Sequence, residues 1–128
     1  MKPYLTIAES VELVEMGVSP ETASHIYSKT KNDGYMICAV SPVLQSIPGR
    51  NIDYEHPCFS VSDILAILPT SIGMHYLDIM KIEPSQWVAS YRNPYTYPPM
   101  TKEERADELI DALAALLKWY VSRKKLQI

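Results

Sequence analysis

The residues of this chain best suited to chemistry are His56 and Cys58, which flank Pro57 just before a predicted helix start at Ser60. The dipole of a helix can lower the pKa of a thiol at its N-terminus, and the resulting thiolate is a nucleophile. A nucleophile also needs a base and an oxyanion pocket. His56 is the nearby base, but Pro57 favours an extended segment, which is expected to turn the side chains of His56 and Cys58 apart. His56, Cys58 and Ser60 are therefore candidates for a ligand site. The alternative is that Cys58 and Phe59 pack the helix start onto the core.

Other patterns for catalysis or metal binding are absent from the sequence. The three histidines are scattered at positions 25, 56 and 75, and no C-x-x-C or H-E-x-x-H pattern occurs. The four glycines are isolated, so there is no glycine-rich phosphate loop. The acidic residues gather mainly where helix starts are predicted, and helix capping accounts for them. We predict no catalytic residue, no metal site and no cofactor.

Tyrosines form a second group of candidates, because aromatic side chains on stiff backbone bind a partner at a small entropic cost. Tyr91, Tyr95 and Tyr97 surround the proline-rich segment 93–99, and Tyr54 lies in the irregular segment 41–57. They are candidates for contact with a partner protein or with a second copy of the chain. The alternative is that they pack loops onto the domain.

Trp119 is a further interface candidate, because it lies within the only basic concentration of the chain. That concentration consists of Lys118, Arg123, Lys124 and Lys125. A cluster of cations with an aromatic ring can bind single-stranded nucleic acid by phosphate contact and base stacking. The formal net charge of −3 argues against nucleic acid as a partner. The alternative is a solvated helix end with the tryptophan at the margin of the core.

Three capping boxes predict the helices that must position these residues. In each box a hydroxyl can accept from a backbone N–H and a carboxylate three residues later can reach back; the boxes begin at Thr6, Ser60 and Thr101. They predict a helix over 7–16, a short buried helix over 60–68 and a long helix over 102–124. After Gly17, which supplies a left-handed stop, Ser19 and Pro20 predict a second helix over 20–27. The long helix has an apolar stripe consisting of Ala106, Leu109, Ile110, Leu113, Leu116, Leu117, Tyr120 and Val121.

Strand-forming residues predict the sheet. Segment 35–40 is apolar on both faces and is predicted to be a buried strand. Segments 74–82 and 86–91 predict an antiparallel hairpin with Trp87, Ala89 and Tyr91 on one face. Segment 41–57 is predicted to be an irregular surface excursion, and segment 93–99 a rigid linker to the last helix.

These elements predict an α+β fold. An N-terminal helical pair, a short buried helix and a long C-terminal helix are expected to pack on a small antiparallel sheet of about three strands. The 128 residues fit a single domain, 1–128. No run approaches the roughly 20 apolar residues of a membrane span, and Met1 is not followed by a signal-peptide core. We therefore expect a cytoplasmic protein with no membrane contact, in which Cys38 and Cys58 stay reduced.

Three stretches of the sequence also carry a resemblance. They are LVEMGVSPETA at 13–23, Pro57-Cys58-Phe59-Ser60-Val61 with Leu65 and Leu68-Pro69, and Leu116-Leu117-Lys118-Trp119. Together they resemble a group of small proteins carried by gut Bacteroidales genomes and their phages or other mobile elements. The resemblance implies a small accessory protein of mobile-element origin, and it brings no activity or site residues.

The leading hypothesis is a non-enzymatic interaction protein with an unknown protein partner or with itself as a homo-oligomer. One alternative is a small enzyme or ligand-binding protein with its pocket near His56 and Cys58. Another is a protein that binds single-stranded nucleic acid through its C-terminal basic turn.

Overall fold

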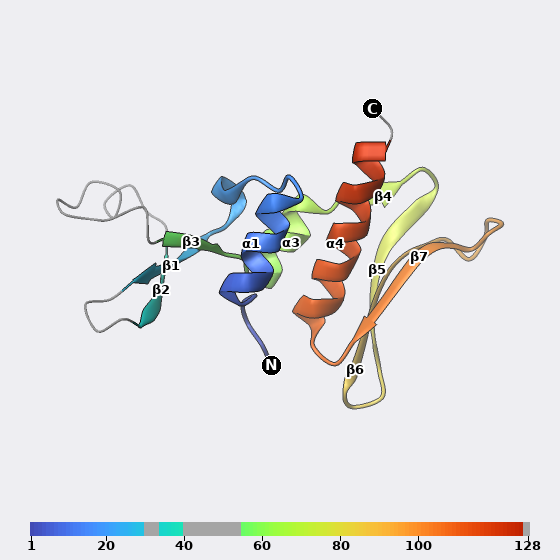
Figure 1. The fold of residues 1–128 in the computed structure, drawn as a ribbon. Coiled ribbons are helices and arrows are strands. Elements are labelled where there is room, and N and C mark those ends of the chain that lie inside the picture. The colour runs from blue at the N-terminus through green and yellow to red at the C-terminus, as the bar shows by residue number, and fades with distance from the viewer. Residues whose placement is uncertain (30–33, 40–54, 127–128) are drawn as a thin grey trace.

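The computed structural model describes residues 1–29, 34–39 and 55–126, and it has an α+β fold with two antiparallel sheets (Figure 1). The helical elements are α1 (Ile7–Glu15), the 3-10 turn η1 (Pro20–Thr22), α3 (Val61–Ile67) and α4 (Leu109–Leu126). The strands are β1 (His25–Lys29), β2 (Tyr35–Ala39), β3 (Glu55–Cys58), β4 (Ser71–Ile72), β5 (His75–Ile82), β6 (Gln86–Arg92) and β7 (Met100–Ala106). One sheet has the order β2-β1-β3 and the other the order β4-β5-β6-β7. The predicted fold class is confirmed, but the prediction of one small sheet is wrong.

The helices lie between the two sheets. Helix α4 packs on β6 and β7 and against α3, whereas α1 packs against β3. In Figure 1 the three-stranded sheet accordingly extends away from α1, on the opposite side of the helices from the four-stranded sheet. One cluster of buried side chains joins the helices to the four-stranded sheet; its fully buried large members are Leu5, Leu13, Phe59, Ile64, Tyr91, Ile110, Leu113, Leu116 and Leu117.

Ion pairs link the start of the chain to α4. The Lys2 ammonium lies 2.8 Å from the carboxylate of Asp111 and 2.8 Å from that of Glu9. Glu12 of α1 lies 2.9 Å from the ammonium of Lys118. Residues more than 100 positions apart are thus in direct contact.

Two of the three predicted capping boxes are present. Thr6 accepts a hydrogen bond from the Glu9 N–H at the start of α1, and Glu9 accepts one from the Thr6 N–H. Ser60 and Asp63 form the same reciprocal pair at α3. Gly17, at φ 111°, ends the first helical segment as predicted. The prediction that α3 is apolar all round and enclosed is wrong in part, because Ser62 and Ala66 are exposed.

The predicted second helix over 20–27 is wrong. Ser19 caps only the three-residue turn η1, and the chain is already extended at Ala23, with ψ 130°. Residues 25–29 then form β1, the central strand, which pairs with both β2 and β3. Backbone pairing on two sides outweighs a helical turn of weak helix formers such as Ile26 and Tyr27.

The predicted buried strand lies at a surface. Strand β2 is the edge of its sheet within the described residues, and Tyr35, Met36 and Ile37 are exposed on it. The predicted irregular segment 41–57 is wrong at its end, because Glu55–Cys58 is strand β3. Its other residues, Tyr54 included, lie outside the described part of the chain.

The predicted helix start at Thr101 is also wrong. Residues 100–106 form β7, which pairs with β6, so segment 93–99 connects two strands and does not lead to a helix. The Thr101 pattern therefore lies within a strand, where alternation puts Lys102 and Glu104 on one face and Glu103 and Arg105 on the other. The predicted hairpin is confirmed as β5 and β6, and the predicted stripe is buried from Ile110 to Leu117 in α4.

Within the described residues, no helix is both long enough and apolar enough to cross a membrane.

Candidate interaction surface

The connection between β6 and β7, residues 93–99, is the most distinctive surface feature of the described chain, and we call it the aromatic loop. Asn93 organises it. The Asn93 amide nitrogen donates to the Met74 carbonyl at 2.8 Å, and its amide oxygen accepts from the Tyr95 N–H at 3.0 Å. The Asn93 N–H donates to the Pro99 carbonyl at 2.8 Å. These bonds close the base of the loop and fix it to the β4–β5 turn.

Thr96 and His75 brace the middle of the aromatic loop. The Thr96 hydroxyl lies 2.9 Å from the Asn93 carbonyl and 3.3 Å from Nε2 of His75. Nε2 of His75 lies 2.8 Å from the Pro98 carbonyl, to which it donates. Prolines at 94, 98 and 99 add fixed φ angles. The backbone of the loop is held by side chains from its own sequence and from β5.

The braced backbone presents two aromatic side chains to solvent. Tyr95 is 95% exposed and Tyr97 is 98% exposed. Met74, on the neighbouring β4–β5 turn, is 67% exposed. Both tyrosines were predicted as interface candidates, and both lie where a partner could reach them.

A cleft of about 460 Å³ adjoins Tyr97. It lies between the β4–β5 turn, the aromatic loop and Arg123 of α4. Sequence reasoning missed this cleft. The dipeptide Asn93-Pro94 is a turn signal that could have marked the loop, but no local pattern relates His75 or Arg123 to it.

Tyr91, another predicted interface residue, lies in the core. It is fully buried, and its hydroxyl donates to the Pro69 carbonyl at 2.7 Å. Burial raises the pKa of Tyr91 to about 12. Tyr91 therefore cannot act as a surface anchor.

Trp119 and two of its basic neighbours, Lys118 and Arg123, make contacts with other side chains of the protein. Trp119 is half-buried against the core, with its ring 6.2 Å from that of Tyr91. The Arg123 guanidinium lies 5.4 Å from the Trp119 ring, and Lys118 is paired with Glu12. The side chain of Lys125 lies outside the described part. This arrangement gives little support to base stacking on Trp119.

The predicted ligand-site residues lie at and beside strand β3. His56 and Cys58 are two positions apart in this strand and so share a face, contrary to the expectation that Pro57 turns them apart. Cys58 is fully buried, and this burial raises the pKa of its thiol, whereas a nucleophile needs a lowered one. The His56 ring lies 5.7 Å from the Tyr35 ring. The geometry favours a structural role for Cys58.

Ser60 lines a separate open cavity of about 450 Å³ at the start of α3. Tyr4, Ser24 and His25 also line it, but His56 and Cys58 do not. The three predicted ligand-site residues are therefore not brought together in this cavity.

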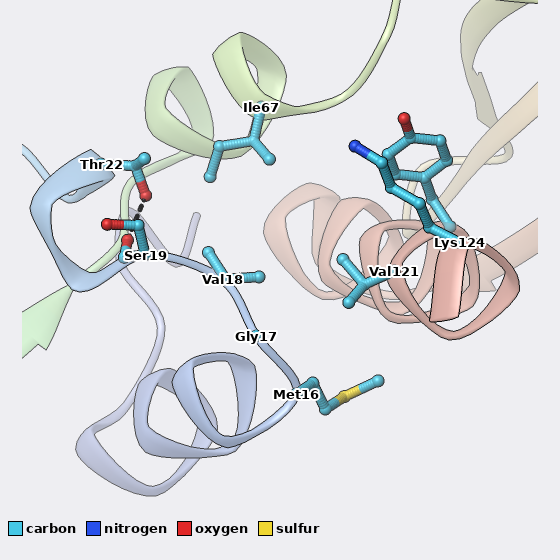
Figure 2. A pocket seen from close by; sticks show the side chains of 9 residues that line it. Met16, Gly17, Val18, Ser19, Thr22, Ile67, Val121 and Lys124 are labelled. Carbon is cyan, nitrogen blue, oxygen red and sulfur yellow. Dashed lines mark hydrogen bonds between the residues drawn. The ribbon is translucent and has the colours of Figure 1, made fainter. Parts of the chain in front are cut away.

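An apolar groove of about 360 Å³ lies at the other end of the helical layer, between the elbow after α1, the end of α3 and the C-terminal part of α4. Figure 2 shows Val18 and Val121 facing each other across it, with Ile67 above them. Lys124 lies at one side, and the Thr22 hydroxyl, which donates to the Ser19 carbonyl at 2.6 Å, lies at the other. The groove offers apolar contact but few polar groups to orient a ligand.

Within residues 1–29, 34–39 and 55–126, no three His, Cys, Asp or Glu side chains lie close enough to hold a metal ion. The chain matches no protein-family model, no curated protein and no solved structure.

Proposed function

We propose that this chain is a non-enzymatic interaction protein and that the aromatic loop is its contact surface. The observation that carries this proposal is the near-complete exposure of Tyr95 and Tyr97 on a backbone braced by Asn93, Thr96 and His75. Tyrosine buries a large area when a partner covers it and has few torsions to immobilise. A loop held in place before binding also loses less entropy on binding.

The partner is another protein or a second copy of the chain. The net charge of −3 disfavours nucleic acid as a partner, and Lys118 is already paired. The resemblance to small proteins of mobile elements is the reason that we include an accessory role in this proposal. The alternative of a small enzyme or ligand-binding protein near His56 and Cys58 has less support, because Cys58 is buried and its pKa is raised.

The test combines substitution of both tyrosines with two binding measurements. Light scattering measures self-association, and affinity capture followed by biolayer interferometry with the purified partner measures hetero-association. The double variant Tyr95→Ala/Tyr97→Ala is expected to weaken the association by at least about tenfold, since a hot-spot aromatic contributes about 2 kcal/mol or more. Thermal stability is expected to stay unchanged, because both side chains are almost fully exposed.

Tyr76→Ala is the matched control, because Tyr76 is 60% exposed but lies on strand β5, outside the aromatic loop. This variant is expected to bind as the unaltered chain does. A monodisperse monomer that retains no partner would contradict the proposal. So would an association that the double variant leaves intact.

A further inference from the structure

One nitrogen of the Arg123 guanidinium lacks a hydrogen-bond partner within the described part of the chain. This atom, Nη1, is buried. The guanidinium carbon lies over the Trp119 ring, 5.4 Å from its centroid, in a cation–π arrangement. Buried polar side-chain atoms are nearly always hydrogen-bonded, so this nitrogen is an exception, and its hydrogen bonding does not offset the charge of the group.

Arg123 also lies at a cleft on the surface. The residue lines the cleft beside the aromatic loop, together with Met74, His75, Tyr97 and Pro98. Among the described residues, no carboxylate lines this cleft. Lys124, the next residue, lies at the mouth of the neighbouring groove and adds to the positive charge of this end of α4. The cleft thus combines apolar and aromatic walls with a guanidinium, and no carboxylate among the described residues lines it.

We propose that this cleft receives an aspartate or glutamate side chain from an extended peptide segment of the partner. The proposal rests on the proposed function, since Tyr97 and Pro98 belong to the contact surface of the aromatic loop. The accessible part of the guanidinium supplies the positive charge that attracts a carboxylate. An apolar residue next to the acidic one packs on Tyr97 and Pro98. The partner is thereby defined as an acidic peptide with a neighbouring apolar residue.

The test uses a random peptide library displayed on phage and selected on the purified chain. The expected result is a set of enriched peptides that share an Asp or Glu beside an apolar residue. Fluorescence anisotropy then measures the affinity of a synthetic enriched peptide. Arg123→Gln is expected to weaken this peptide at least about tenfold, and so is Asp→Asn or Glu→Gln within the peptide. The peptide-side change keeps the test valid if Arg123→Gln fails to fold.

Arg105→Gln is the matched control, because Arg105 is exposed on β7, away from the cleft. It is expected to leave the affinity unchanged. Tyr97→Ala distinguishes this inference from the proposed function. Peptides that need Tyr97 but contain no acidic residue and ignore Arg123→Gln would overturn the inference and leave the proposed function standing. A selection in which no enriched peptide depends on Tyr95 or Tyr97 would overturn both.

Discussion

At the scale of single residues, Asp63 is a carboxylate that accepts several hydrogen bonds at once. Its Oδ2 atom accepts from the Ser60 N–H at 2.9 Å and from the Ser24 N–H and hydroxyl at 3.0 Å each. Burial acts to raise the pKa of Asp63, but these hydrogen bonds outweigh burial and hold the pKa below its ordinary value. The capping box of α3 thus also fixes the residue that precedes β1. This is a structural role for the helix start that follows His56 and Cys58.

Asp63→Asn is expected to lower the free energy of unfolding by about 1–2 kcal/mol at neutral pH, because the hydrogen bonds lose their charged acceptor. Since the folded pKa lies below the unfolded one, the carboxylate stabilises the fold above about pH 4 and loses this effect as the pH falls further. Denaturant titrations at pH 7 and pH 3 measure the difference between variant and parent, which should shrink at low pH. The exposed Asp107→Asn serves as control. A difference that is the same at both pH values would contradict the assigned role of the carboxylate.

At the scale of elements, two sequence patterns of the same type, a hydroxyl followed three residues later by a carboxylate, have different outcomes. The Ser60 box caps a helix, whereas the Thr101 pattern lies in strand β7, which is at the edge of its sheet among the described strands. Ser60→Ala is therefore expected to cost about 1 kcal/mol of stability, the usual loss for an N-cap. Thr101→Ala is expected to stay within about 0.5 kcal/mol, as at other exposed positions. Equal losses in chemical denaturation would show that the assignment of β7 is wrong.

The elements that sequence predicts correctly are those whose information is local. The box at Thr6 and the stop at Gly17 define α1, and the spacing of Ile110, Leu113 and Leu117 defines the buried face of α4. Strands β1 and β7 were predicted as helices because their local sequence patterns fit both a helix and a strand. Their pairing partners, which decide between the states, lie elsewhere in the chain.

In the candidate interaction surface, too, features set by local sequence could be predicted, whereas features set by contacts between distant segments could not. Tyr95 and Tyr97 could be predicted, because prolines and tyrosines in one short segment indicate a stiff aromatic loop. Their bracing by His75 and the proximity of Arg123 depend on packing between β5, α4 and the loop. Tyr91, only a few residues away, was predicted as an interface residue because sequence proximity does not reveal which side chains face inward.

At the scale of the whole molecule, Tyr91 connects the four-stranded sheet to the helical layer through its bond to Pro69. Tyr27 makes a comparable link, since its hydroxyl donates to the Leu5 carbonyl. Burial raises the pKa of both tyrosines to about 12. Because the folded pKa exceeds the unfolded value of about 10, their stabilisation is complete below pH 10 and is lost as the pH rises toward 12.

Tyr91→Phe is expected to reduce this alkaline loss of stability, because phenylalanine has no proton to release. At neutral pH the variant should lose about 1 kcal/mol, the contribution of one hydrogen bond. Unfolding followed by circular dichroism between pH 8 and pH 12 measures both effects. Tyr95→Phe, at a ring that is 95% exposed, is the control. If Tyr91→Phe and the parent lost stability identically at alkaline pH, the assigned contribution of the buried Tyr91 hydroxyl would be contradicted.

The ion pairs from Lys2 and Glu12 to α4 have a consequence for synthesis on the ribosome. Helix α4 is the last element of the described chain to be translated, yet it supplies the charges that these early residues meet and much of the surface that α3 packs against. Isolated helices as short as α1 and α3 are marginal in water. The nascent chain must therefore wait for α4 to leave the ribosome before its first residues reach their final contacts.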